Sequence, residues 1–179
     1  MPLPPFYGCA IPGDANCTDP GGCTGVPGTC LFIPGAPIAA LPGSLEAKEA
    51  GRRLQCAIRY ALDNNVQIVY VCGQYSILNA DEFGTDVSAF RKVGANKVLK
   101  VIGRSTATSD SLIRVSPDAA APKFRFFFVE NGGTLTLTNL TLLDGRADTG
   151  TNSSGGAVFV ESTSSGTGAP SQFEATNCA

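Results

Sequence analysis

The chain has 179 residues, 13 basic and 15 acidic side chains, a formal net charge of −2, and no histidine or tryptophan. This length fits one domain, and the balanced charge argues against nucleic acid as a partner, because phosphate binding needs a clustered positive surface. The missing histidine excludes Ser-His-Asp and Cys-His catalytic systems within the chain. No apolar run approaches the roughly 20 residues that cross a bilayer, so no transmembrane segment is expected.

Residues 1–43 are rich in residues that interrupt regular structure. They hold nine of the twelve prolines, eight glycines and four of the seven cysteines. Proline lacks a backbone donor and glycine resists ordering, so helices and strands are disfavoured here. We therefore expect an irregular extension over residues 1–43, joined by disulfides to a folded domain over residues 44–179.

The cysteines favour disulfides over a metal site. None of the seven forms a CxxC pair, which weakens a zinc interpretation. Their density among loop residues is typical of an oxidising compartment, meaning a secreted protein, the cell surface or an organelle lumen. Free thiols in a reducing compartment are the alternative. The disulfide candidates are Cys9, Cys17, Cys23, Cys30, Cys56 and Cys72, and sequence alone does not give their connectivity.

Residues 44–64 carry the signals of one amphipathic helix. Ser44 is a plausible N-cap and Glu46 suits the positive helix end. Apolar residues recur from Leu54 to Leu62 at helical spacing, and Asn64 or Asn65 can end the helix in a left-handed conformation. Such a helix needs an apolar surface to cover, and we expect it to cap one end of a β structure.

The rest of the chain reads as short strands separated by turns. We predict strands over 66–71, 97–102, 111–115, 125–130, 133–143, 156–161 and 171–176. No second helical pattern supplies βαβ crossovers. Gly132-Gly133 and Gly155-Gly156 each precede a strand at a spacing of 23 residues, which falls in the range of repeat architectures. A β-sandwich is the alternative.

The segment 133–143 is the most informative of these strands. Leucines and threonines alternate through it, but the alternation changes phase at Asn139. Two half-buried strands joined at a one-residue corner produce this pattern. The segment thus predicts a bend at Asn139, with leucines facing a core.

Three stretches together resemble a known class of proteins. They are LQCAIRYALDNNVQIVYVCGQYSI (54–77), VLKVIGRS (98–105), and RFFFVENGGTLTLTNLTLLDG (125–145) with GGAVFV (155–160). They resemble the opening of a right-handed parallel β-helix of the pectin-lyase-like class, and the last is similar to polymorphic-membrane-protein-type repeat proteins. The resemblance implies an all-β solenoid with an N-terminal capping helix and an irregular Pro/Gly/Cys-rich lobe. It covers residues 54–179 and says nothing about residues 1–43.

The resemblance also implies one class of enzymatic function. Several enzymes of this class cleave acidic polysaccharides in a calcium-dependent reaction, and Glu130, Asp144, Asp148 and Glu161 with Arg125 and Arg146 are the side chains available for it. These residues read equally well as solvated surface or turn positions, since charges are mostly exposed. No cofactor or resident metal is expected.

Three kinds of surface residue stand out as candidates. Alternation in the segment 125–128 sends Phe127 to the face opposite its neighbours, where it either makes a contact with a partner or is covered by another layer of the chain, such as residues 1–43. Thr134, Thr136 and Thr138 form a T-x-T row of the kind that binds ice, although threonine is also a common outward strand residue. Asn16, Asn139 and Asn152 begin N-x-[ST] glycosylation triplets.

The sequence therefore favours a non-enzymatic structural or interaction module, either an adhesion surface or a subunit of a larger assembly. The last strand would be exposed unless a protein partner or the remainder of a longer chain covers it. Carbohydrate is a second partner class that the sequence leaves open. The alternatives are a polysaccharide-active enzyme fragment and, less favoured, an ice- or surface-binding protein.

Overall fold

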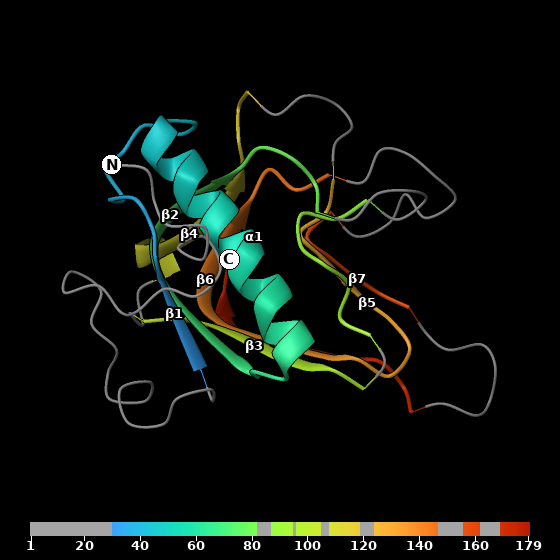
Figure 1. Ribbon diagram of the computed structural model, residues 1–179. Coiled ribbons are helices and arrows are strands. Elements are labelled where there is room, and N and C mark those ends of the chain that lie inside the picture. Colours follow the sequence, from blue (N-terminus) through green and yellow to red (C-terminus); the bar gives the residue numbers. More distant parts are fainter. Residues whose placement is uncertain are drawn as a thin grey trace.

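The computed structural model describes residues 30–81, 87–94, 96–104, 108–118, 124–146, 156–161 and 169–179. A single long helix packs against a set of stacked strands (Figure 1). The elements are β1 (Cys30–Pro34), α1 (Leu45–Asn64), β2 (Ile68–Ile77), β3 (Val98–Gly103), the short 3-10 turn η1 (Thr108–Asp110), β4 (Ser111–Val115), β5 (Phe127–Val129), β6 (Thr134–Leu143), β7 (Val158–Val160) and β8 (Gln172–Cys178). The predicted helix and all seven predicted strands are confirmed, and the first of those strands continues to Ile77.

Every ladder between two named strands is parallel. The first half of β2 pairs with β1 and β3, while its second half pairs with β4. Likewise, the first half of β6 pairs with β3 and β8, and its second half with β4. A separate two-stranded sheet joins β5 to β7. The antiparallel sandwich alternative is therefore excluded among the described strands.

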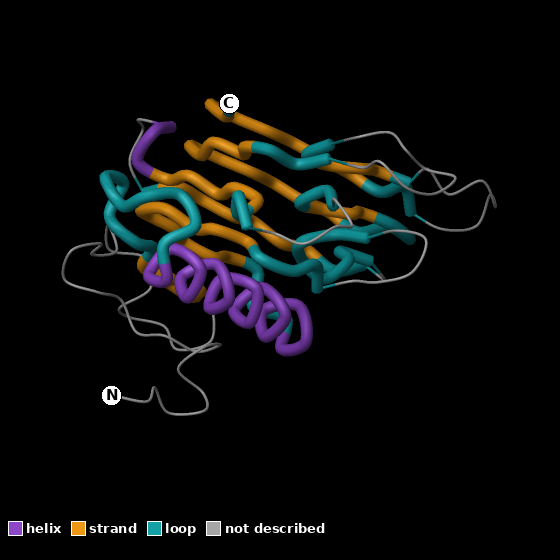
Figure 2. The backbone as a smooth tube through the Cα atoms, turned by 90° about the horizontal axis from the view of Figure 1, so that it is seen from above, coloured by secondary structure: helices purple, strands orange, loops and turns teal. Residues whose placement is uncertain are grey.

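The prediction of an all-β, right-handed parallel β-helix is wrong. The structure is mixed α/β, with one 20-residue helix packed on a mostly parallel six-stranded sheet. In that prediction, the helix over residues 44–64 is a cap on a core that strands alone form. Instead the helix supplies a large share of that core, through Ala50, Leu54, Ala57, Ile58, Ala61 and Leu62. Figure 2 shows that α1 lies at one end of the stack of strands and that β8, the C-terminal strand, lies at the other end.

Part of the Pro/Gly-rich segment also differs from its prediction. Residues 30–34, placed within an irregular extension, form strand β1 and pair in register with β2 from Cys30↔Ile68 to Pro34↔Cys72. The reason is local, because Leu31, Phe32 and Ile33 are an uninterrupted apolar run and Pro34 comes only at its end. Residues 1–29 lie outside the described residues.

Both ends of α1 form as the sequence indicates. The Ser44 side chain accepts a hydrogen bond from the Ala47 amide at 3.2 Å, and Asn65 closes the helix in a left-handed conformation with φ of 57°. At Gly51 the helix lies against β2, where an added Cβ would stand 2.2 Å from the Ser76 carbonyl oxygen. Side chains larger than hydrogen are therefore excluded at this contact.

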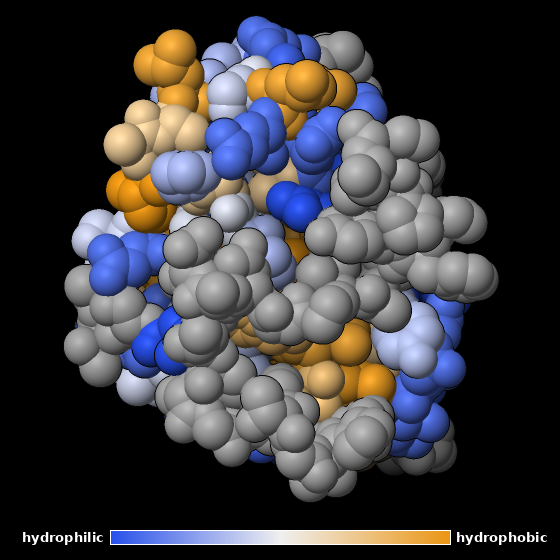
Figure 3. Space-filling model, turned by 60° about the vertical axis from the view of Figure 1, so that its left-hand side comes forward, coloured by the Kyte–Doolittle hydropathy of each residue, from blue (hydrophilic) through white to orange (hydrophobic). Residues whose placement is uncertain are grey.

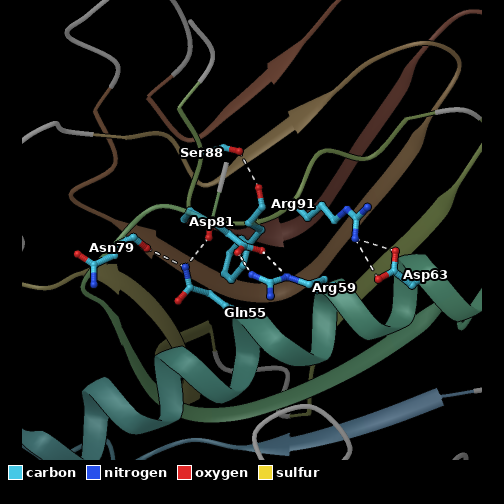
Figure 4. A network of polar contacts seen from close by, with 9 residues as sticks. Gln55, Arg59, Asp63, Asn79, Asp81, Ser88 and Arg91 are labelled. Atoms are coloured by element: carbon cyan, nitrogen blue, oxygen red, sulfur yellow. Dashed lines mark hydrogen bonds and ion pairs between the residues drawn. The ribbon is translucent and has the colours of Figure 1, made fainter. Parts of the chain in front are cut away.

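Polar side chains of α1 hold residues 79–81 and 89–91 beside the helix (Figure 4). Gln55 donates to the carbonyl oxygens of Asn79 at 2.8 Å and Ala89 at 2.6 Å. Arg59 pairs with Asp81, and Arg91 donates to the Asp63 carboxylate at 2.7 and 3.0 Å. Because most of these groups are exposed, the pairs add orientation more than stability.

The bend predicted at Asn139 is confirmed. Asn139 has a left-handed φ of 54°, a conformation that asparagine tolerates better than most residues. Leu135, Leu137 and Leu140 are buried on either side of it. Because the alternation of leucine and threonine shifts by one residue at Asn139, leucines on both sides of the bend in β6 point into the core.

A buried tyrosine fixes the start of the sheet. Tyr75 is fully buried, and its hydroxyl donates to the carbonyl oxygen of Ile33 on β1, with the carbonyl oxygen of Cys72 on β2 also within hydrogen-bonding distance at 3.0 Å. The same hydroxyl oxygen accepts from the Cys72 amide at 2.9 Å. Burial raises the pKa of the Tyr75 phenol above its ordinary value, and the hydrogen bond with Cys72 opposes this only in part. The phenol therefore stays neutral in the folded chain.

Replacement of Tyr75 by phenylalanine is expected to cost about 1–3 kcal/mol of unfolding free energy, because the carbonyl oxygen of buried Ile33 and the amide of half-buried Cys72 lose a hydrogen-bond partner. Urea unfolding followed by circular dichroism measures the change. Tyr70→Phe is the matched control, since Tyr70 is a half-buried residue of the same strand.

The raised pKa of Tyr75 gives the substitution a pH signature. Above the unfolded tyrosine pKa of about 10, the unfolded chain loses a proton that the folded chain keeps, so stability falls as pH rises. This alkaline loss should be smaller in Tyr75→Phe than in wild type. An equal loss in both would contradict the buried, neutral phenol.

Candidate interaction surface

The last described strand, β8, exposes side chains on the same face of the sheet as the buried leucines of β6. In the β6–β8 ladder Phe173 is paired with Leu135 and Ala175 with Leu137. Both leucines are buried, whereas every residue of β8 is exposed and Phe173 retains 41% of its accessible area. Among the described strands, β6 is the only partner of β8. This end of the sheet thus has a strand edge and an apolar face that the described residues do not cover.

An apolar hollow lies beside this strand. Its volume is about 450 Å³, and its lining is almost entirely apolar. The residues that line it are Leu137, Leu142, Ala157, Val158, Phe173, Ala175, Cys178 and Ala179. We call the part contributed by residues 157–158 and 173–179 the β8 surface. Its apolar lining is typical of a binding site rather than of open surface.

Other apolar side chains reach the solvent in separate places. Ile38, Leu41 and Leu45, around the start of α1, are strongly exposed. On the face drawn in Figure 3, hydrophobic residues likewise lie in separate patches among hydrophilic ones. Ile38 and Leu41 lie in a loop and Leu45 begins a helix, so this group has no strand edge. The β8 surface is the one that combines apolar side chains with an open ladder.

The charge and corner of the β8 surface are also defined. Residues 156–161 and 169–179 contain two carboxylates, Glu161 and Glu174, and no lysine or arginine. At the corner, Asn177 repeats the left-handed conformation of Asn139 with φ of 50°, and its amide donates to the Asn139 side-chain oxygen at 2.8 Å. The β8 surface is therefore apolar and bent at a known residue, and the charged side chains on the described segments that form it are acidic.

The threonine row lies on the opposite face of the same sheet. Thr134, Thr136 and Thr138 are half-buried, and their neighbours are on β3 and β8 rather than on the segments 126–129 and 157–160. The rows across the sheet read Val98-Thr134-Gln172, Lys100-Thr136-Glu174 and Ile102-Thr138-Thr176. Two of the three rows contain no second threonine. A flat, repeated threonine array is thus not formed by these strands.

Of the two alternatives for Phe127, exposure as a contact residue is wrong, and coverage by another part of the chain is what the structure shows. Phe127 is fully buried, and its ring centroid lies 4.7 Å from that of Phe90. The amides of Phe126 and Phe127 both donate to the Ala157 carbonyl oxygen, at 3.0 and 3.1 Å. Two residues, Phe126 and Phe127, thus lie opposite the single residue Ala157, as in a β-bulge, and this interrupts the alternation of faces along the segment. The neighbouring Phe128 is also covered, by the Phe159 ring and the Lys92 ammonium group.

The cysteine candidates divide into three groups. Cys30 and Cys72 are disulfide-bonded. Along the β1–β2 ladder Cys72 is paired with Pro34 rather than with Cys30, an offset of about 13 Å that excludes a bond between them. Cys56, expected to be a disulfide candidate, is instead a free, half-buried thiol on α1, as is the exposed Cys178 on β8. Cys9, Cys17 and Cys23 lie outside the described residues.

The glycosylation and catalytic candidates are not brought into one site. Asn16, Asn152 and Asp148 lie outside the described residues, and the Asn139 side chain is engaged with Asn177. Glu130 lies 3.6 Å from the Lys92 ammonium and Asp144 lies 3.5 Å from the Arg114 guanidinium. In the described ranges, no three Asp, Glu or Cys side chains are grouped as metal ligands.

The chain was compared with known proteins at three levels. No family model, no curated protein and no solved structure matches it. The resemblance of its motifs to pectin-lyase-like proteins thus stays a prediction. In the described part of the chain, no helix is long and apolar enough to cross a membrane.

Proposed function

We propose that this chain is a non-enzymatic interaction module that binds another polypeptide through the β8 surface, as an adhesion domain or an assembly subunit. The observation that carries the proposal is the exposure of Phe173 and Ala175 in the phase of buried Leu135 and Leu137. Apolar groups in this position gain free energy when a partner covers them. An open strand edge gives such a partner backbone donors and acceptors as well.

The disulfides support an oxidising compartment as the location of this function. Cys30 and Cys72 are both bonded, and disulfides persist in oxidising compartments. A secreted, surface or lumenal protein is therefore part of the proposal. The polysaccharide-cleaving alternative has less support, because Glu130 and Asp144 lie beside cations of neighbouring strands and loops rather than facing each other across a groove.

Affinity capture with matched variants tests the proposed function. The immobilised chain is incubated with an extract of its own source organism, in parallel with Phe173→Asp and Gln172→Asp chains. Phe173→Asp places a charge on the apolar surface, whereas Gln172→Asp places the same charge on the opposite face of the same strand. We expect a partner that wild type and Gln172→Asp retain and that Phe173→Asp loses by tenfold or more, about the effect of removing one buried phenylalanine.

Circular dichroism and thermal unfolding of the three chains confirm that each is folded. Because residues 172 and 173 are both exposed, neither substitution should change stability by more than about 0.5 kcal/mol. Failure to retain any partner, or equal retention by all three chains, would contradict the proposed function.

A further inference from the structure

We infer that the β8 surface binds one extended strand of a partner polypeptide, parallel to β8, with apolar residues opposite Phe173 and Ala175, a basic residue opposite Glu174 and an asparagine opposite Asn177. This inference rests on the proposed function and specifies its ligand. The ligand class is a peptide strand that adds to an existing sheet.

The backbone of β8 is arranged for such an addition. The Gln172 amide donates at 2.8 Å to the carbonyl oxygen of Gly133, the residue just before β6. In a parallel ladder, alternate residues bond to opposite neighbours, so the amides of Phe173 and Ala175 point to the open edge. An added strand therefore finds donors there without any rearrangement of β8.

The corner determines the direction of the added strand. Asn139 and Asn177 bend their strands at paired positions, and the side-chain hydrogen bond between them spans the two. A parallel strand with asparagine at the next corner position can bend in the same way and continue this contact. An antiparallel strand would reach the corner with the opposite chain sense, so its bend would not follow that of β8.

The side chains determine its composition. Residues opposite Phe173 and Ala175 extend the apolar row that begins with buried Leu135 and Leu137. Glu174 continues the row of Lys100 and Thr136 on the other face, and the only charged residues on the described segments 156–161 and 169–179 are acidic. A lysine or arginine opposite Glu174 complements this charge, as opposite charges do across strands.

A second copy of this chain does not have these properties. The end of the molecule opposite β8 is covered by α1 (Figure 2), whose exposed face carries charged residues such as Glu46, Arg52 and Asp63. A two-fold pair joined through β8 would be antiparallel, so the bend at Asn177 of one copy would not follow that of the other. The structure thus favours a strand of different sequence.

A labelled peptide of sequence KGTLKLTNLTGK tests the inference by fluorescence anisotropy. In the proposed register its LKLTN segment lies opposite residues 173–177. We expect saturable binding to the wild-type chain and to Gln172→Asp, and about tenfold weaker binding to Phe173→Asp. A peptide with the same residues in reverse order, KGTLNTLKLTGK, can place LKLT opposite residues 173–176 in a parallel strand, but glycine then lies opposite Asn177. It tests the asparagine corner at constant composition and should bind at least about fivefold more weakly.

Charge reversal tests the register. Glu174→Lys should weaken binding of the lysine peptide about threefold to fivefold, and a peptide with glutamate at that position should regain the loss. Equal binding of the forward and reversed peptides, or no rescue by charge reversal, would overturn the inference. So would a self-association of the chain in sedimentation that Phe173→Asp abolishes, because the occupant would then be a second copy.

The two proposals can fail separately. If the capture experiment yields a partner that depends on Phe173 but the forward peptide does not bind, the interaction function stands and the parallel-strand ligand is rejected. Peptide binding that does not depend on Phe173 also rejects the ligand, since it would occur elsewhere on the chain.

Discussion

Replacing Gly103 with alanine is expected to destabilise the folded chain by about 3 kcal/mol. A Cβ at this position would lie 1.8 Å from the Asn139 carbonyl oxygen and 2.9 Å from the Ser111 hydroxyl. Neither atom can move freely. Asn139 is the corner of β6, and the Ser111 hydroxyl donates to the Val71 carbonyl oxygen at 3.1 Å. A single methyl group would thus force apart strands that meet at the bends of β3 and β6. Urea unfolding monitored by circular dichroism measures the loss.

Gly94→Ala is the matched control for this substitution. The nearest atom to a Cβ at Gly94 is the Glu130 Cγ at 3.1 Å, which belongs to a flexible, half-buried side chain that can move aside. We expect a cost of less than about 1 kcal/mol. Similar losses for the two glycines would show that the close approach at Gly103 does not determine the stability of the stacked strands.

The features that the sequence predicted well depend on residues near each other in the chain. Ser44 and Asn65 mark the helix ends through hydrogen bonds within one turn. The change of phase at Asn139 is a property of ten consecutive residues. In each case the signal and the structure are both local, so no knowledge of the tertiary fold was needed.

The features that it missed depend on contacts between distant segments. The neighbours of β6 are β3, β4 and β8, not the segments that flank it in sequence. The two glycine pairs spaced by 23 residues precede strands of different sheets, because β6 belongs to the six-stranded sheet and β7 pairs with β5. Val98 is paired with Thr134 and Thr134 with Gln172, so these strands stack at intervals well above 23 residues.

The candidate site was predicted in outline but not by residue. The need for a cover over the last strand follows from the exposed edge of any sheet. Its components were missed, since Phe173 and Ala175 alternate with polar residues in the same way as buried strand residues do. The residue chosen instead, Phe127, is buried against Phe90, and the amides of Phe126 and Phe127 share one acceptor on Ala157. A bulge of this kind depends on the partner strand and has no signal in the segment itself.

Leu54→Ala is expected to cost about 3–4 kcal/mol of unfolding free energy, because the leucine is fully buried among helix and strand residues of the core. The substitution separates the observed mixed α/β architecture from the expected one. If α1 were only a cap on a core formed by strands, the loss would be small and confined to the helix. Since α1 is part of the core, the whole chain should unfold at lower denaturant concentration, with tertiary and helical signals changing together.

Arg52→Ala is the control on the same helix, because Arg52 is exposed two residues before Leu54. It should shift the unfolding free energy by no more than about 0.5 kcal/mol. Amide hydrogen exchange adds a second readout. In Leu54→Ala, protection should fall in β2 as well as in α1, because the two elements share the buried face of the helix. A loss of protection limited to α1, or a cost below about 1 kcal/mol, would mean that the strands hold the core without the helix.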